Sequence, residues 1–123
     1  MAVKHGLGET LQVLRQVVSD RGHDHVYKEQ ERQKGVSVRC KYVENDGPSC
    51  IVGHVASRLG VPIETLKEWD EGFLQQVPTV GYRVFDESAL DVLSQAQFSQ
   101  DYGSTWGEAL RRAEERAAEL SQH

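Results

Sequence analysis

The sequence predicts a mainly α-helical fold of about five helices with a small β-hairpin, forming one domain over residues 1–123. Apolar residues recur every three or four positions in several segments, which is the spacing of amphipathic helices. One short segment instead alternates apolar and polar residues, as a half-buried strand does. A chain of 123 residues is the usual size of one domain and can bury a modest core.

The first half of the chain contains one helix and the predicted hairpin. Leucines at positions 7, 11 and 14 predict an amphipathic helix that ends at Gly22. Residues 23–34 are polar and fit either a loop or an edge strand. Residues 36–42 alternate in polarity, so we expect a strand there and a hairpin turn at residues 34–35. Residues 45–48 read Asn-Asp-Gly-Pro, which predicts a second turn.

Four further helices are predicted after that turn. Ser49 is a suitable N-cap for a helix over 50–59, and Pro62 is a suitable first residue for the next helix. Residues 71–80 lose helical periodicity and predict a loop, and residues 82–85 predict a short strand. Two longer helices follow over 86–101 and 106–120, the second with a capping-box spacing from Thr105 to Glu108.

The pair of helices over residues 49–69 has the spacing of a helix-turn-helix. Ala56 is a small contact residue, Gly60 permits a tight turn, and apolar anchors follow it. The second helix is acidic, however, with four carboxylates at positions 64, 68, 70 and 71 against the single Lys67. Because DNA phosphates repel carboxylates, and because the whole chain has a net charge of -5, this composition disfavours DNA binding.

Cys50 and His54 lie four positions apart on one helix face, so they are a candidate reactive or metal-binding pair. A third catalytic member is not evident, and we predict no catalytic residue. A zinc site would need Cys40 together with His23 or His25, without the close Cys-x2-Cys spacing of structural zinc sites. We therefore expect no metal, no cofactor, and two reduced cysteines that pack as small apolar residues.

The compartment follows from two sequence features. No run approaches the ~20 apolar residues of a membrane span. The N-terminal residues lack the hydrophobic region of a signal peptide. These features predict a cytoplasmic protein with no membrane association.

Residues 40–61, CKYVENDGPSCIVGHVASRLGV, and residues 95–110, QAQFSQDYGSTWGEAL, resemble segments of small proteins from actinobacteriophages and actinobacterial genomes. The Asp-Gly-Pro-Ser-Cys turn is the most specific part of this resemblance. It implies a phage or prophage setting inside a bacterial host, and it carries over no catalytic residue.

These observations together predict a small phage-type protein that acts without catalysis by binding another protein, expected to be a host protein, or a second copy of itself. The candidate contacts are the acidic surface of the second helix and the exposed face of the last helix. The candidate contact residues on and after the acidic helix are Glu64, Lys67, Glu68, Glu71 and Phe73. The alternative is a helix-turn-helix DNA-binding transcriptional regulator in which Thr65, Lys67 and Glu68 face DNA.

Overall fold

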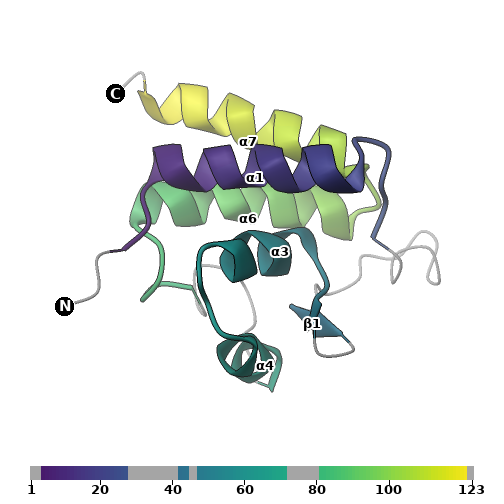
Figure 1. The fold of residues 1–123 in the computed structure, drawn as a ribbon. Coiled ribbons are helices and arrows are strands. Elements are labelled where there is room, and N and C mark those ends of the chain that lie inside the picture. The colour runs from purple at the N-terminus through teal and green to yellow at the C-terminus, as the bar shows by residue number, and fades with distance from the viewer. Residues whose placement is uncertain (1–3, 28–41, 45–46, 72–80, 122–123) are drawn as a thin grey trace.

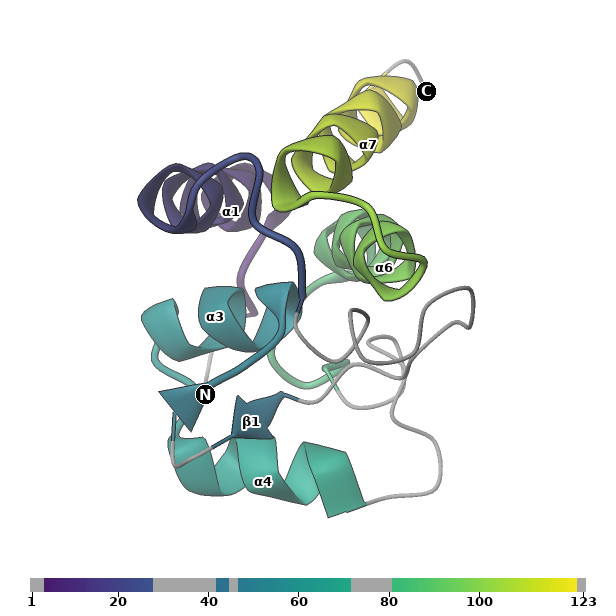
Figure 2. The same ribbon diagram turned by 90° about the vertical axis from the view of Figure 1, so that its right-hand side faces the viewer.

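A computed structural model describes residues 4–27, 42–44, 47–71 and 81–121 of the chain. Within these ranges the fold is mainly helical, as predicted, with five helices and one two-stranded antiparallel sheet. Helices α1 (Leu7–Arg21), α6 (Glu87–Asp101) and α7 (Trp106–Ser121) lie together as one group (Figure 1). Helix α3 (Ile51–Arg58) packs beneath this group, and α4 (Ile63–Glu71) lies beyond α3, farthest from α7 (Figure 2).

The helical periodicities identified in the sequence produce the core. Leu14, Val17 and Val18 of α1 are fully buried, and α1 contacts α3, α6 and α7. The other fully buried apolar side chains come mainly from α3, α6 and the start of α7, and they include Ile51, Val52, Val55, Leu93 and Trp106. The core thus holds α3 directly against α1 and α6, and the His54 ring against Trp106 at the start of α7.

The predicted helix ends are confirmed where glycine stops the helix. Gly22 follows α1, Gly60 follows α3 and Gly103 follows α6, and all three have positive φ. Because residues with a Cβ rarely adopt that conformation, these positions end each helix sharply.

The hairpin lies elsewhere than predicted. Its strands are β1 (Val43–Glu44) and β2 (Gly47–Pro48), with Val43 paired to Pro48. Gly47 and Pro48, predicted to lie in a turn, are therefore in a strand. The Ser49 N–H donates to the Tyr42 carbonyl and extends the pairing by one residue. The strand predicted over 36–42 and its turn at 34–35 fall, except for residue 42, outside the described residues.

Residues 82–85 also differ from the predicted strand. The N–H groups of Val84 and Phe85 both donate to the Gly81 carbonyl, which folds this segment into a turn. Phe85 alone forms a β-bridge, pairing with His5 in parallel orientation. The bridge brings the segment that precedes α1 beside the segment that precedes α6.

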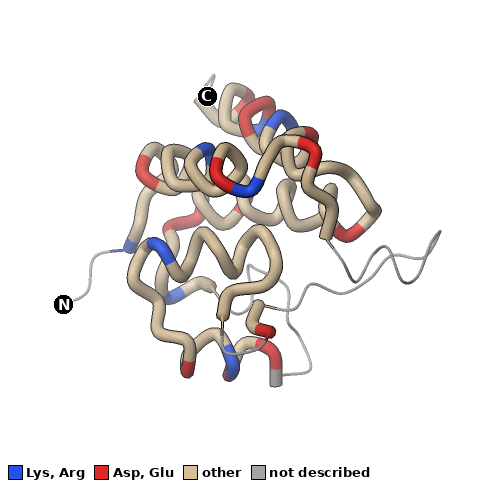
Figure 3. Tube along the Cα trace, turned by 45° about the vertical axis from the view of Figure 1, so that its right-hand side comes forward, with Lys and Arg blue, Asp and Glu red and all other residues tan. Residues whose placement is uncertain are grey.

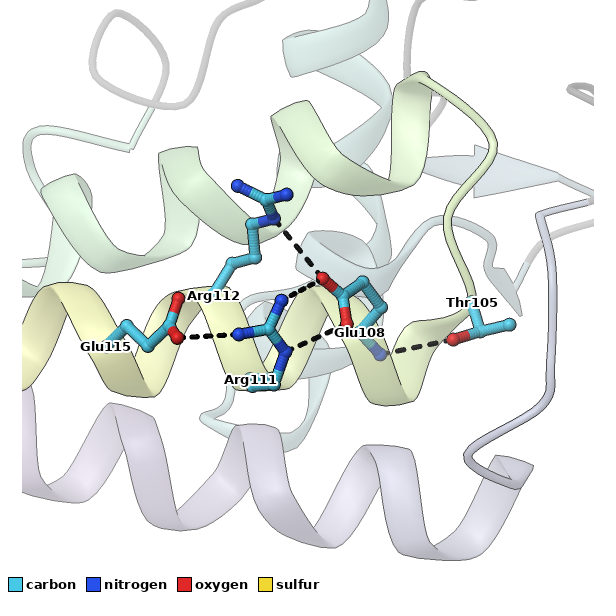
Figure 4. A network of polar contacts seen from close by, with 5 residues as sticks. All are labelled: Thr105, Glu108, Arg111, Arg112 and Glu115. Carbon is cyan, nitrogen blue, oxygen red and sulfur yellow. Dashed lines mark hydrogen bonds and ion pairs between the residues drawn. The ribbon is translucent and has the colours of Figure 1, made fainter.

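Helix α7 begins with the cap predicted at Thr105. The Thr105 hydroxyl accepts from the Glu108 N–H at 3.1 Å, while the Glu108 carboxylate binds Arg111 and Arg112 instead of reaching back to Thr105 (Figure 4). The hydrogen bond from Arg111 holds the pKa of Glu108 below its usual value. Arg111 also pairs with Glu115 at 2.6 Å, so the network lies along the exposed face of α7.

None of the helices in the described part of the chain is long and apolar enough to span a membrane.

Candidate functional site

The junction between α3 and α4 is a tight turn centred on Gly60. The Val61 N–H donates to the Ala56 carbonyl at 3.0 Å, and the Gly60 N–H donates to the Ser57 carbonyl at 3.1 Å. This pair of bonds is a Schellman motif, which satisfies the last carbonyls of α3 and reverses the chain. The spacing argument for a helix-turn-helix is therefore correct.

Apolar contacts anchor the second helix of this motif. Val61, Leu66 and Trp69 are all at least nine-tenths buried. The Trp69 ring packs edge-on against Tyr42, with ring centroids 5.3 Å apart. These contacts turn the opposite face of α4 outward.

Helix α3 receives much of its positioning from other elements. Its N-cap is Cys50, whose sulfur accepts from the Gly53 N–H at 3.4 Å, and not Ser49, whose hydroxyl instead contacts Tyr27 and Glu44. The Ile51 N–H donates to the side-chain carbonyl of Gln100 on α6 at 2.8 Å. This buried bond joins the start of the helix-turn-helix to the long helices.

The acidic character of α4 is only partly on its exposed face. Glu64, Lys67 and Glu68 are exposed, and Thr65 is half-buried. Asp70 is different: its two carboxylate oxygens accept from the backbone N–H groups of Tyr42 and Val43, at 2.9 and 3.1 Å. This carboxylate therefore serves to hold α4 against β1.

Two other predicted contact residues are not placed. Phe73 lies outside the described residues, and so does the side chain of Glu71, although its backbone ends α4. The exposed face of α4 within the described side chains is therefore two glutamates and one lysine around Thr65.

A cleft of about 270 Å³ lies beside the turn of the helix-turn-helix. Thr65 on α4, Arg83 in the turn before α6 and His5 before α1 contribute its polar side chains. The remaining lining residues belong to the Gly60 turn and to Val84.

The Tyr82–Arg83 pair is a feature that the sequence reasoning did not identify as part of a site. Both side chains are exposed, and the Arg83 Nε donates to the Tyr82 hydroxyl at 2.9 Å. The guanidinium carbon lies 5.4 Å from the centre of the Tyr82 ring, a cation–π distance. Within the described chain Arg83 forms no ion pair, whereas Arg58 binds Asp20 at 2.7 Å. The sequence signal that could have identified this pair is an arginine next to an aromatic residue, directly after Gly81.

The candidate pair Cys50 and His54 does not have the expected chemistry. Cys50 is disulfide-bonded, so the expectation of a reduced thiol is wrong, and the sulfur cannot act as a thiolate nucleophile. Burial lowers the pKa of His54 to about 4, helped by the charges of Arg21, Arg58 and His25. The His54 ring packs edge-on to Trp106, with centroids 5.5 Å apart, so it serves as a neutral packing residue. The described residues contain no cluster of three or more metal-ligating side chains.

Comparison with known families decides between the two predicted functions. The family described as MerR HTH family regulatory protein matches residues 51–112, which is half of the chain. The chain belongs to the MerR family of helix-turn-helix regulatory proteins. The match begins at the first residue of α3 and runs through α4 and α6 into α7. Neither the curated proteins nor the solved structures provide a significant match to the chain.

Membership of the MerR family corrects our prediction of function. We predicted a protein partner or a second copy as the main ligand and treated DNA as disfavoured, and the family match overturns both statements. The charge argument treated every carboxylate of α4 as part of its outer face. Asp70 instead accepts from backbone N–H groups of Tyr42 and Val43, which precede the matched region, so its charge is used in an internal contact.

Proposed function

We propose that this protein is a DNA-binding transcriptional regulator that acts without catalysis. The match of the MerR family to residues 51–112 is the observation that supports the proposal most strongly. The Schellman turn at Gly60 and the buried anchors of α4 support it independently, because they give the matched segment helix-turn-helix geometry.

In this proposal the exposed face of α4 enters the major groove, which is wide enough to admit a helix. Thr65, Lys67 and Glu68 are the residues on that face that would meet base edges. A glutamate can accept a hydrogen bond from the amino group of cytosine, and a threonine can bond to several bases. An acidic reading helix is therefore compatible with DNA when nearby cations contact the phosphates.

Arg83 is the best-placed cation for that role. It is exposed, it borders the cleft beside the α4 turn, and its Nε bond to Tyr82 fixes the orientation of the guanidinium. Arginine binds phosphate through planar pairs of N–H donors, so a held guanidinium loses little conformational freedom on binding.

The test is a fluorescence-anisotropy titration of the full chain against a pool of random-sequence duplexes at ~50 mM salt, followed by selection of the bound sequences. We expect binding, enrichment of a defined sequence, and a logarithmic salt slope of about -2 to -3, because few cations face the DNA. Arg83→Gln should weaken binding to selected and random duplexes alike.

Arg15→Gln is the matched control, because it removes the same charge from α1, where Arg15 is exposed and pairs with Glu114. No binding to any duplex at ~50 mM salt would overturn the proposal. If Arg83→Gln and Arg15→Gln bind DNA with equal affinity, Arg83 does not contact DNA. The phage or prophage setting implied by the sequence resemblance stays a prediction, as does a cytoplasmic location.

A further inference from the structure

The segment that precedes α1 lies against the candidate DNA-binding site, although it is outside the region that the MerR family matches. The His5 N–H donates to the Val84 carbonyl at 2.8 Å, and the Asp86 N–H donates to the His5 carbonyl at 3.0 Å. These two bonds fix His5 beside the turn that carries Arg83.

The side chain of His5 is also held in place. Its Nδ1 is hydrogen-bonded to the Glu9 carboxylate one helical turn later, and its ring lies 6.2 Å from the Phe85 ring. His5 lines the cleft together with Thr65 and Arg83. The cleft is thus assembled from three separate segments of the chain, one of which lies before α1.

Lys4 adds a positive charge at this position. It is exposed, and within the described residues it forms no ion pair or hydrogen bond. Figure 3 shows blue positions gathered on the side of the molecule where the described chain begins, while red and blue alternate along α7. On α7 the basic side chains are neutralised by neighbouring carboxylates, as Arg111 is by Glu108 and Glu115.

The carboxylates near the cleft differ in whether another group of the protein already binds them. Glu9 is bound to His5, and the Asp86 carboxylate accepts from the Ala89 N–H at 3.0 Å as the cap of α6. Glu64 on α4 and Glu87 at the start of α6 are both exposed, so acidic groups also border this side. The two cations Lys4 and Arg83 therefore lie on adjoining segments at one border of the helix-turn-helix.

We infer that Lys4 and His5 extend the DNA interface beyond the matched family region by contacting a backbone phosphate next to the one that Arg83 contacts. This inference rests on the proposed function. Phosphate contacts position a protein on DNA without reading sequence. The added segment would therefore raise affinity for every duplex and leave the preferred sequence unchanged.

The experiment measures affinity and salt slope for Lys4→Gln against the selected duplex and a scrambled duplex. One lost phosphate contact should lower affinity about 15-fold near 50 mM salt and about threefold near 0.3 M, and should reduce the salt slope by about 0.9. The ratio of the two affinities should not change. Lys4→Arg should keep nearly full affinity, and His5→Gln should show a smaller loss than Lys4→Gln.

Arg15→Gln again controls for the change in net charge, and circular dichroism melts of each variant control for folding. The inference is overturned if Lys4→Gln matches Arg15→Gln in affinity and salt slope while the unaltered protein binds DNA. If the unaltered protein binds no duplex, the proposed function itself fails. A changed sequence preference in Lys4→Gln would also contradict the inference, because it would indicate a base contact.

Discussion

Replacing Gln100 with methionine tests how α6 positions the helix-turn-helix. Gln100 is fully buried, and its side-chain carbonyl accepts from the Ile51 N–H at 2.8 Å. Methionine has a similar volume, so the substitution removes the acceptor without opening a cavity. The Ile51 N–H would then be buried at the first turn of α3 without a partner.

An unpaired buried donor costs about 1–3 kcal/mol. The weaker bond from the Gln100 amide to Asp101, at 3.1 Å, adds little because that carboxylate can bind water. We therefore expect the free energy of unfolding to fall by about 2 kcal/mol, equivalent to a melting temperature lower by roughly 8 °C. Urea unfolding followed by far-ultraviolet circular dichroism measures this change.

Gln95→Met is the matched control, because Gln95 is exposed on the same helix. It should change stability by less than about 0.5 kcal/mol. If Gln100→Met is no less stable than Gln95→Met, the buried bond does not hold α3, and the account of how α6 positions the helix-turn-helix is wrong.

Two further substitutions test the packing around α3. Gly53→Ala should destabilise the fold by about 3 kcal/mol, measured by urea unfolding, because its Cβ would lie 2.4 Å from the Tyr42 carbonyl oxygen. His54→Gln should make stability less dependent on pH. The ring has a pKa of about 4 when folded and 6.5 when unfolded. Between these values only the unfolded chain binds the proton, so stability falls as pH decreases through 6.5 and levels off near 4. Because the ring is partly solvated, the loss should be about 1–2 kcal/mol, seen in melts from pH 7 to 4.

Each of these substitutions has its own check. Gly8→Ala is the control for Gly53→Ala, because a Cβ at Gly8 meets nothing within 4 Å and should stabilise α1 by about 0.5–1 kcal/mol. Equal effects at the two glycines would contradict the steric argument. If His54→Gln loses as much stability on acidification as the unaltered protein, His54 is not buried in its neutral form.

The sequence was sufficient to predict the helices because their signals are local. Apolar spacing located α1, α3 and α7, and glycines at the helix ends marked where the chain leaves each helix. The turn at Gly60 was predictable for the same reason, since a Schellman motif needs only a glycine and neighbouring backbone groups.

The rest depends on contacts between distant residues. From the sequence, Asp70 is interpreted as a surface charge. Only the structure shows that its carboxylate accepts from the Tyr42 and Val43 N–H groups. Arg83 was assigned to a strand because alternation in polarity is a weak signal over four residues, and hydrogen bonds to the Gly81 carbonyl decide the turn. The role proposed for Lys4 depends on the bridge between His5 and Phe85, which no local sequence pattern predicts.

The bond between Ile51 and Gln100 also links folding to function. The two residues lie 49 positions apart in the chain, and among the described residues the other side-chain acceptor at the start of α3 is the Cys50 sulfur. Sulfur is a weak acceptor, and a helix as short as Ile51–Arg58 is unstable alone in water. The segment 49–71, cut out as a peptide, should therefore be largely unstructured. The helix-turn-helix then depends on the whole cooperative fold, because α3 needs its contact with α6. If the protein binds DNA as proposed, a partly folded chain would present no such surface.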